Sequence, residues 1–212
     1  MIRKLLDALL PATCASCGEV AGDADLVQIC ATCADQIPGH VWPVSELIPC
    51  VRGSWYLLQY AGMGGALIRA GKYGGRELLL GELAELFAQA ALATELPSFD
   101  LIVAAPGPWR RLADRGFSAP QIFSTALSRA LSVPQGSPLK REMRPMQAGL
   151  QEEERAANVS GAYELTEKIT GAKILLVDDV VTTGATATEC AETLLLGGAE
   201  SVHLLTFASV LG

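Results

Sequence analysis

Two adjacent acids, Asp178 and Asp179, stand between an apolar run and a stretch of small and hydroxyl-bearing residues, TTGAT at 182–186. If a helix begins there, its first backbone N–H groups are unpaired and its dipole adds partial positive charge, so the turn could bind a phosphate. Gly184 would allow a positive φ or a close approach of the backbone. Carboxylates repel phosphate but accept hydrogen bonds from hydroxyl groups. The pattern therefore predicts a site for a ligand that carries both groups, such as a ribose 5-phosphate.

Two other interpretations of this segment are weaker. The threonines could merely cap the helix while the two acids form a solvated strand end. The run LLVDD is also similar to a Walker B strand, but the chain has no G-x-x-x-x-G-K-[ST] segment to accompany it. The coincidence of apolar strand, double acid and small-residue turn favours the phosphate site.

Four cysteines, Cys14, Cys17, Cys30 and Cys33, form a C-x2-C-x12-C-x2-C array near the start of the sequence. Each CxxC turn can present two thiolates to one metal ion, and two turns complete the closed tetrahedral coordination of a structural Zn²⁺. A redox role for the CxxC pairs is the alternative. Because the motif is duplicated within a segment too short to have a core of its own, a metal site is favoured.

Cationic residues gather in loops next to expected strand ends, in a chain with only 16 Lys and Arg. This placement suggests anion binding, although ordinary solvated surface explains any single one of them equally well. The residues are Lys72, Arg110, Arg111, Arg115, Lys140, Arg141, Arg144 and Arg155.

Apolar periodicity from residue 51 onward predicts alternating strands and helices. Strands are expected at 54–60, 100–106, 172–179 and 201–207, and helices at 66–72, 78–96, 119–131 and 186–196. The strand, loop, helix and strand at the end of the sequence form a βαβ unit, whose right-handed crossover places the loop at the carboxyl edge of a parallel sheet. The expected fold is α/β and Rossmann-like, a mostly parallel sheet flanked by helices at 50–212, with a small zinc-ribbon module at 1–42.

Composition limits the classes of function. The net charge is −7 and the pI is about 4.9, which argues against a protein that coats nucleic acid. No apolar stretch is long enough to span a bilayer, and Asp7 and Pro11 interrupt the apolar N-terminal segment, so it is expected to belong to the mature protein. Clustered cysteines suit a reducing compartment, and a cytoplasmic location is predicted. The remaining cysteines, Cys50 and Cys190, are expected to be buried small apolar residues.

Residues 175–187 resemble the phosphoribosyl pyrophosphate (PRPP) binding motif of the type I phosphoribosyltransferases. Together with the four cysteines, LIRAGKYGGR at 67–76, RRLADRGF at 110–117 and QAGLQEEERAANVSGAY at 147–163, the motif is similar to the ComF family of bacterial proteins over nearly the whole chain. The resemblance implies a phosphoribosyltransferase fold with an N-terminal zinc element. The chain departs from the family pattern at Gly107, Trp109, Ser118, Ala119 and Arg144.

The resemblance also implies roles for individual residues. Asp178 and Asp179 would hold the ribose 2- and 3-hydroxyls, residues 105–108 would lie in the pyrophosphate loop, and residues 141–158 would form a flexible loop that closes over PRPP. The implied ligand-binding residues are Asp178, Asp179, Val180, Thr182, Thr183, Gly184, Ala185, Thr186, Ala105, Pro106 and Gly107. From their loop positions, Lys72, Arg111 and Arg115 are predicted to offset the charge of the leaving group, with Mg²⁺ bridging the ribose hydroxyls and the pyrophosphate.

Two functions remain open on these grounds. One is phosphoribosyl transfer to an unidentified acceptor with release of pyrophosphate. The other is a non-catalytic PRPP- or nucleotide-binding accessory protein, because the resemblance implies a link to natural transformation and DNA uptake alongside a competence helicase and single-stranded DNA. A zinc finger that binds DNA directly is disfavoured, since only Arg3 and Lys4 lie near the cysteines. The sequence leaves the acceptor and the oligomeric state undetermined.

Overall fold

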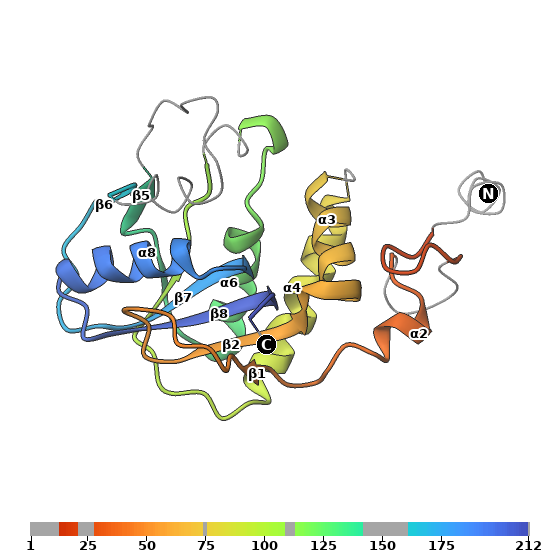
Figure 1. The fold of residues 1–212 in the computed structure, drawn as a ribbon, viewed down its shortest axis with the longest axis horizontal. Coiled ribbons are helices and arrows are strands. Elements are labelled where there is room, and N and C mark those ends of the chain that lie inside the picture. The colour runs from red at the N-terminus through yellow and green to blue at the C-terminus, as the bar shows by residue number, and fades with distance from the viewer. Residues whose placement is uncertain (1–12, 21–27, 74–75, 109–112, 142–160, 212) are drawn as a thin grey trace.

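The computed structural model describes residues 13–20, 28–73, 76–108, 113–141 and 161–211 of the 212-residue chain (Figure 1). Its strands are β1 (Trp42–Pro43), β2 (Ser54–Gln59), β3 (Leu101–Ala104), β4 (Gln135–Gly136), β5 (Leu139–Arg141), β6 (Tyr163–Leu165), β7 (Lys173–Val181) and β8 (Ser201–Ser209). Its helices are α2 (Ala31–Ala34), the π-type segment η1 (Tyr60–Gly64), α3 (Gly65–Tyr73), α4 (Glu77–Leu92), α6 (Ala119–Leu131) and α8 (Ala185–Leu196).

Six strands form one sheet in the order β1-β2-β8-β7-β3-β4. All its neighbouring strands are parallel except β1, which pairs antiparallel with β2 at one edge. β7 lies between β8 and β3, and its side chains from Ile174 to Val177 are fully buried. An apolar strand buried on both faces is what a parallel sheet covered by helices requires.

The two faces of the sheet have separate cores, and β7 contributes to both because its side chains alternate. Leu175 and Val177 pack in the core formed with α3, α4 and α6. Ile174 and Leu176 pack in the other core, formed with α8 and the β5–β6 hairpin. Figure 1 shows the hairpin beside α8, away from α3 and α4. The next two residues of β7 are the two acids, so the same alternation sends Asp178 and Asp179 to opposite faces.

The direction of the connections reverses between β3 and β7. From β3 the chain crosses through α6 to β4 on one side, whereas from β7 it crosses through α8 to β8 on the other. Ligands of open α/β sheets bind at the carboxyl ends of strands where such a reversal occurs, because the two following loops separate and leave a crevice. The fold thus places a crevice next to the acids.

The predicted strands and helices are confirmed, although several bounds differ. β3 ends at Ala104 rather than at residue 106, and β8 continues to Ser209 rather than ending at residue 207. The helix expected to reach residue 96 ends at Leu92, where the Thr94 hydroxyl donates to the Ala90 carbonyl at 2.8 Å. β7 continues through both acids to Val181. The prediction for Cys50 was wrong, because this residue is exposed with φ of 63°, whereas Cys190 is buried as predicted.

The predicted domain bounds, 1–42 and 50–212, stay predictions. Within the described residues, the segment between them is attached to the sheet, because β1 pairs with β2. Among these residues no helix has the length and apolar character needed to cross a bilayer.

Candidate functional site

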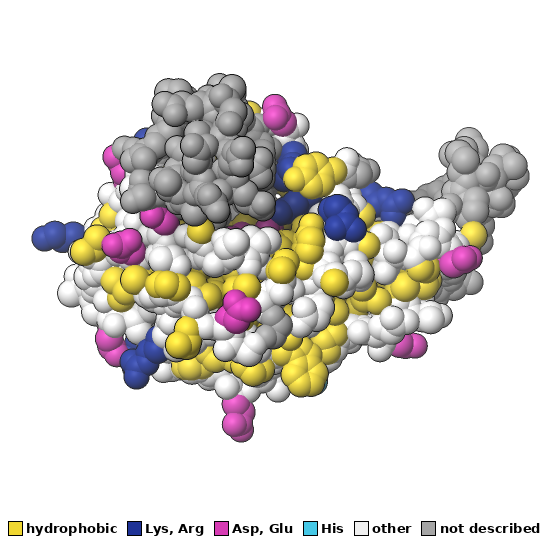
Figure 2. Space-filling view, viewed as in Figure 1, with side chains coloured by type: hydrophobic (Ala, Val, Ile, Leu, Met, Phe, Trp, Pro, Cys, Tyr) yellow, Lys and Arg dark blue, Asp and Glu magenta, His cyan; other side chains and the backbone are white. Residues whose placement is uncertain are grey.

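A cleft of about 340 Å³ opens at the carboxyl edge of the sheet, at the reversal between β3 and β7. Its lining brings together predicted site residues from four separate parts of the sequence. They are Lys72, Ala105, Pro106, Gly107, Arg115, Asp178, Asp179, Val180 and Thr186. Figure 2 shows Lys and Arg side chains gathered at the upper edge of this face, beside the grey residues.

The two acids have different surroundings. Asp179, on the α3 face of β7, forms an ion pair with Lys72 near the end of α3, and both side chains are largely buried, at 12 % and 17 % exposure. Asp178 lies on the α8 face, and its Oδ1 accepts a hydrogen bond from the Asp179 N–H at 2.8 Å. Burial, and after it the neighbouring charge of Asp179, raise the pKa of Asp178 to about 8. The pair therefore resists holding two negative charges while the cleft is empty.

The turn after β7 forms a second, smaller hollow of about 60 Å³. It is lined by Thr182, Thr183, Gly184, Ala185 and Thr186, and it shares Asp178, Val180 and Thr186 with the cleft. The two hollows are therefore adjacent, and together they present carboxylates at one end and a helix N-terminus at the other.

Gly184 is the N-cap residue directly before α8, with φ of 77°, and no side chain caps this helix end. The Thr183 hydroxyl accepts only a long hydrogen bond, 3.4 Å, from the Ala185 N–H. The alternative in which the threonines serve mainly as helix caps is therefore not supported. A Cβ on Gly184 would lie 3.2 Å from the Ile48 side chain, so the turn rests directly on this residue from the segment before β2.

The loop after β3 forms another wall of the cleft. Ala105 is held by a 2.8 Å hydrogen bond from its N–H to the Val177 carbonyl, which keeps this loop beside β7. Arg115 lines the same wall, with Cζ 4.2 Å from the centroid of the Tyr73 ring. Arg111 and the predicted loop residues 142–158 lie outside the described residues.

The hairpin supplies lining residues that the sequence analysis did not assign to the ligand site. Tyr163 of β6 and Arg141 of β5 both face the cleft. Outside the hairpin, Phe117, which precedes α6, also lines it. Arg141 was noted as one of several loop cations and as the first residue of the predicted flexible loop, but it lies in β5. Tyr163 was not singled out, although it is the last residue of the GAY segment, which resembles the ComF pattern. The signal was the short apolar strand that follows the predicted flexible loop.

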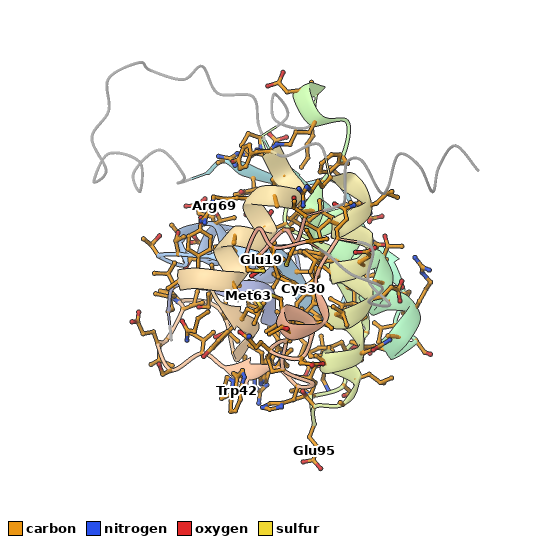
Figure 3. All side chains as sticks on the ribbon, turned by 90° about the vertical axis from the view of Figure 1, so that its right-hand side faces the viewer. Glu19, Cys30, Trp42, Met63, Arg69 and Glu95 are labelled. Atoms are coloured by element: carbon orange, nitrogen blue, oxygen red, sulfur yellow. The ribbon has the colours of Figure 1, made fainter. Side chains whose placement is uncertain are left out.

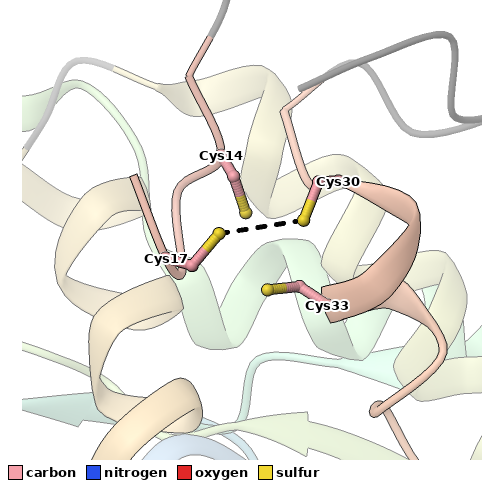
Figure 4. Close-up of side chains that lie close together, drawn as sticks. All are labelled: Cys14, Cys17, Cys30 and Cys33. Atoms are coloured by element: carbon pink, nitrogen blue, oxygen red, sulfur yellow. Dashed lines mark hydrogen bonds between the residues drawn. The ribbon is translucent and has the colours of Figure 1, made fainter. Parts of the chain in front are cut away.

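The four cysteines cluster as predicted, with their Sγ atoms within 4.8 Å of one another and pointing toward a common centre (Figure 4). The Sγ atoms of Cys17 and Cys30 are 3.8 Å apart, close to the separation of roughly 3.8 Å that tetrahedral Zn–S bonds of about 2.3 Å impose. Burial disfavours the Cys14 thiolate, but backbone hydrogen bonds from Cys17, Cys30 and Ser16 lower its pKa to about 6. The cluster can hold a metal ion.

The cysteine module shares a core with α3 and α4, and it lies in front of these helices in the view of Figure 3. Cys14 and Cys33 are buried in the core that includes these helices. Arg76, at the start of α4, donates to the Thr13 carbonyl at 3.0 Å and to its hydroxyl at 3.2 Å. The same α3 that carries Lys72 into the cleft thus also supports the module.

A parallel sheet with a double acid and a small-residue turn at its reversal defines a phosphoribosyltransferase-type domain, and a phosphoribosyl transferase domain family model matches residues 122–211. The DNA utilization protein YhgH of Salmonella typhi is 30% identical over 197 residues, covering 90% of this chain and 81% of that protein. The chain belongs to the ComF-type phosphoribosyltransferase family.

Other relatives match over less of their length. The DNA utilization protein YhgH of Escherichia coli K12 is 35% identical over 121 residues, which are 56% of this chain and 52% of that protein. Among solved structures, adenine phosphoribosyltransferase from Leishmania tarentolae has a TM-score of 0.43 and 12% identity, covering 79% of this chain and 96% of that chain.

Proposed function

We propose that the cleft binds PRPP or a related ribose 5-phosphate ligand together with Mg²⁺. The observation that supports this most is the adjacency of the two hollows, which share Asp178, Val180 and Thr186. One hollow offers hydrogen-bond acceptors to hydroxyl groups, and the other offers the N-terminus of a 12-residue helix to a phosphate. A ribose 5-phosphate carries both groups.

Each part of the ligand has a partner in this arrangement. Asp178 and Asp179 accept from the ribose hydroxyls, and the turn from Thr182 to Thr186 takes the 5-phosphate. We assign the pyrophosphate group attached to C1 to the backbone of the loop after β3, because Ala105 and Gly107 line the same cleft as the two acids. Bound Mg²⁺ would neutralise part of the pyrophosphate charge, and hard oxygen donors such as the two aspartates suit it.

The reaction we propose is displacement at C1 of the ribose. The bond from C1 to the pyrophosphate oxygen breaks, its electron pair leaves with the pyrophosphate, and the nucleophile of the acceptor forms a new bond to C1. Because the ribose develops positive charge before the new bond is complete, the protein acts by positioning and by charge stabilisation. The acidic pair and the cations that line the cleft would provide these two effects.

Calorimetric titration with PRPP and Mg²⁺, and with ribose 5-phosphate, tests the proposal. Wild-type protein is expected to bind both, and the double variant Asp178→Ala/Asp179→Ala is expected to bind neither. The matched control is Glu95→Ala/Glu192→Ala, which also removes two carboxylates but from exposed positions outside the cleft. Absence of binding to wild type, or equal loss in the control, would contradict the proposal.

A second candidate function is that of a PRPP- or nucleotide-binding accessory protein without turnover. It is favoured by the relatives, whose name refers to DNA utilization. A competence helicase or single-stranded DNA machinery would then be the partner. The discriminating measurement is pyrophosphate release from PRPP across a panel of purine, pyrimidine and amine acceptors. Release with any acceptor supports the transferase, whereas PRPP binding without release supports the accessory role.

We also propose that the four cysteines hold a structural Zn²⁺. A site with four thiolate ligands has no open position for substrate, so its contribution is to the stability of the module and to its packing on α3 and α4.

A further inference from the structure

The cations around the cleft are not equivalent. Lys72 is already matched by Asp179, with which it forms an ion pair. For Arg115 and Arg141 no carboxylate lies within ion-pair distance among the residues that the structure describes. Arginine in a cleft without a carboxylate partner has its donors available for an anion, and its planar fork suits phosphate oxygens.

Arg141 is held in place by the hairpin itself. It lies directly opposite Tyr163 in the antiparallel pair of β5 and β6, and its Cζ is 5.6 Å from the centroid of the Tyr163 ring. Directly paired side chains share one face of a hairpin, so both residues line the cleft. The neighbouring Lys140 points to the other face and is exposed. Strand alternation therefore selects Arg141 and excludes Lys140.

Tyr163 is a rigid support for this arginine. The residue is 5 % exposed and packs in the core of the α8 face. Its hydroxyl oxygen is buried beside the thiol of Cys190, which is itself buried on α8. A buried ring under a guanidinium fixes the cation by a cation–π interaction and removes rotamer freedom before the ligand arrives.

We infer that Arg141, supported by the ring of Tyr163, binds an anionic group of the ligand in the cleft, and that Lys72 serves Asp179 instead. Arg115, with Cζ 4.2 Å from the Tyr73 ring centroid, is the corresponding cation of the opposite wall. Two arginines on opposite walls suit a group with several negative charges, and the assignment of this group as the pyrophosphate rests on the proposed function. Arg141 is thus a ligand-binding residue, and Tyr163 is a positioning residue that acts through it.

Titration of single variants with inorganic pyrophosphate and Mg²⁺ tests the inference. Arg141→Gln is expected to lower pyrophosphate affinity about tenfold or more, as loss of a charge-assisted contact does, while Lys140→Gln changes it less than about twofold. Ribose 5-phosphate affinity is expected to stay within about threefold in both variants, because that ligand lacks the pyrophosphate group. Wild-type affinity in Arg141→Gln, or an equal loss in Lys140→Gln, would overturn the inference.

The positioning role of Tyr163 is tested separately, by comparing pyrophosphate binding in single and double variants. Tyr163→Leu is expected to weaken pyrophosphate binding, Tyr163→Phe to retain it, and Arg141→Gln/Tyr163→Leu to bind no more weakly than Arg141→Gln alone. Additive losses in the double variant would show that Tyr163 does not act through Arg141. If wild type binds pyrophosphate but not ribose 5-phosphate, the proposed function fails while this inference stands. If wild type does not bind pyrophosphate, the inference itself is wrong.

Discussion

Lys72 and Asp179 form an ion pair that joins the last turn of α3 to the carboxyl end of β7. Among the residues that the structure describes, no cation lies within ion-pair distance of the adjacent carboxyl group, Asp178. Two neighbouring acids in one strand therefore have different environments. Asp179 is paired with the Lys72 ammonium group. Asp178 is available to change its charge when a ligand or a cation enters.

Removal of Lys72 is expected to destabilise the fold. Lys72→Met leaves the largely buried Asp179 unpaired, which should lower the free energy of unfolding by about 1–3 kcal/mol. The double variant Lys72→Met/Asp179→Asn should recover part of this loss. The control is Lys173→Met, which breaks an exposed pair with Glu200 and should cost less than about 1 kcal/mol. Urea denaturation of the four proteins measures these differences, and equal effects of Lys72→Met and Lys173→Met would contradict the prediction.

Stability of the ligand-free protein is expected to fall as the pH rises, because of Asp178. Its pKa is about 8 in the folded protein and about 4 in an unfolded chain. A group whose pKa is raised by folding stabilises the fold while it is protonated, and this contribution is lost as pH increases through the folded value. Asp178→Asn removes the effect, and its amide oxygen can still accept the Asp179 N–H.

Thermal unfolding at pH 5.5 and 8.5 measures this dependence. The midpoint of Asp178→Asn should exceed that of wild type by a margin that grows with pH and reaches about 3 °C or more at pH 8.5. Glu192→Gln, an exposed carboxylate on α8, should show no growing margin. A constant difference at both pH values would refute the assignment of this pH dependence to Asp178.

The cysteine cluster is expected to hold one zinc ion per chain. Cys17→Ser should lower the zinc content of purified protein well below one equivalent, and chelation of wild type should lower its thermal midpoint. Cys17 is exposed, so the substitution removes a ligand without opening the core. Elemental analysis provides the measurement, and Cys50→Ser, a change at an exposed cysteine outside the cluster, is the control that should retain the metal. Full zinc content in Cys17→Ser would exclude the four-thiolate site.

Gly184 is expected to be required both for the turn and for phosphate binding. Gly184→Ala forces a side chain into a left-handed conformation, at about 1–2 kcal/mol, and brings its Cβ to 3.2 Å from Ile48. Both stability and ribose 5-phosphate affinity should fall. The control is Gly171→Ala, at a glycine that also has a positive φ but has open space around it. This variant should lose stability and keep its affinity for ribose 5-phosphate.

Ile48→Ala, which removes the γ- and δ-carbons that the Gly184 Cβ would contact, should restore part of the lost affinity in the Gly184→Ala background. This result would separate the effect of the contact from that of backbone strain. Calorimetry with ribose 5-phosphate is the measurement. Unchanged affinity in Gly184→Ala would show that the turn does not hold the phosphate.

The sequence by itself determined the features that are local. The acids, the small-residue turn and the start of the helix after them lie within residues 175–187, so their order along the chain fixes their arrangement once a strand and a helix form. The four cysteines were likewise identified by their spacing, since each CxxC turn places two sulfur atoms together regardless of the rest of the fold.

The tertiary structure decided which partner each local group has. Lys72 reaches Asp179 because α3 packs on one face of β7, and strand alternation directs Asp178 to the other face. Arg141 lies over Tyr163 because of the register of a hairpin whose strands are separated by residues 142–162. These pairings depend on packing between segments distant in sequence, and no local pattern of charge or periodicity encodes which cation meets which acid. The sequence therefore specified the kinds of chemistry, and the packing of α3, β7 and the hairpin assigned them to particular residues.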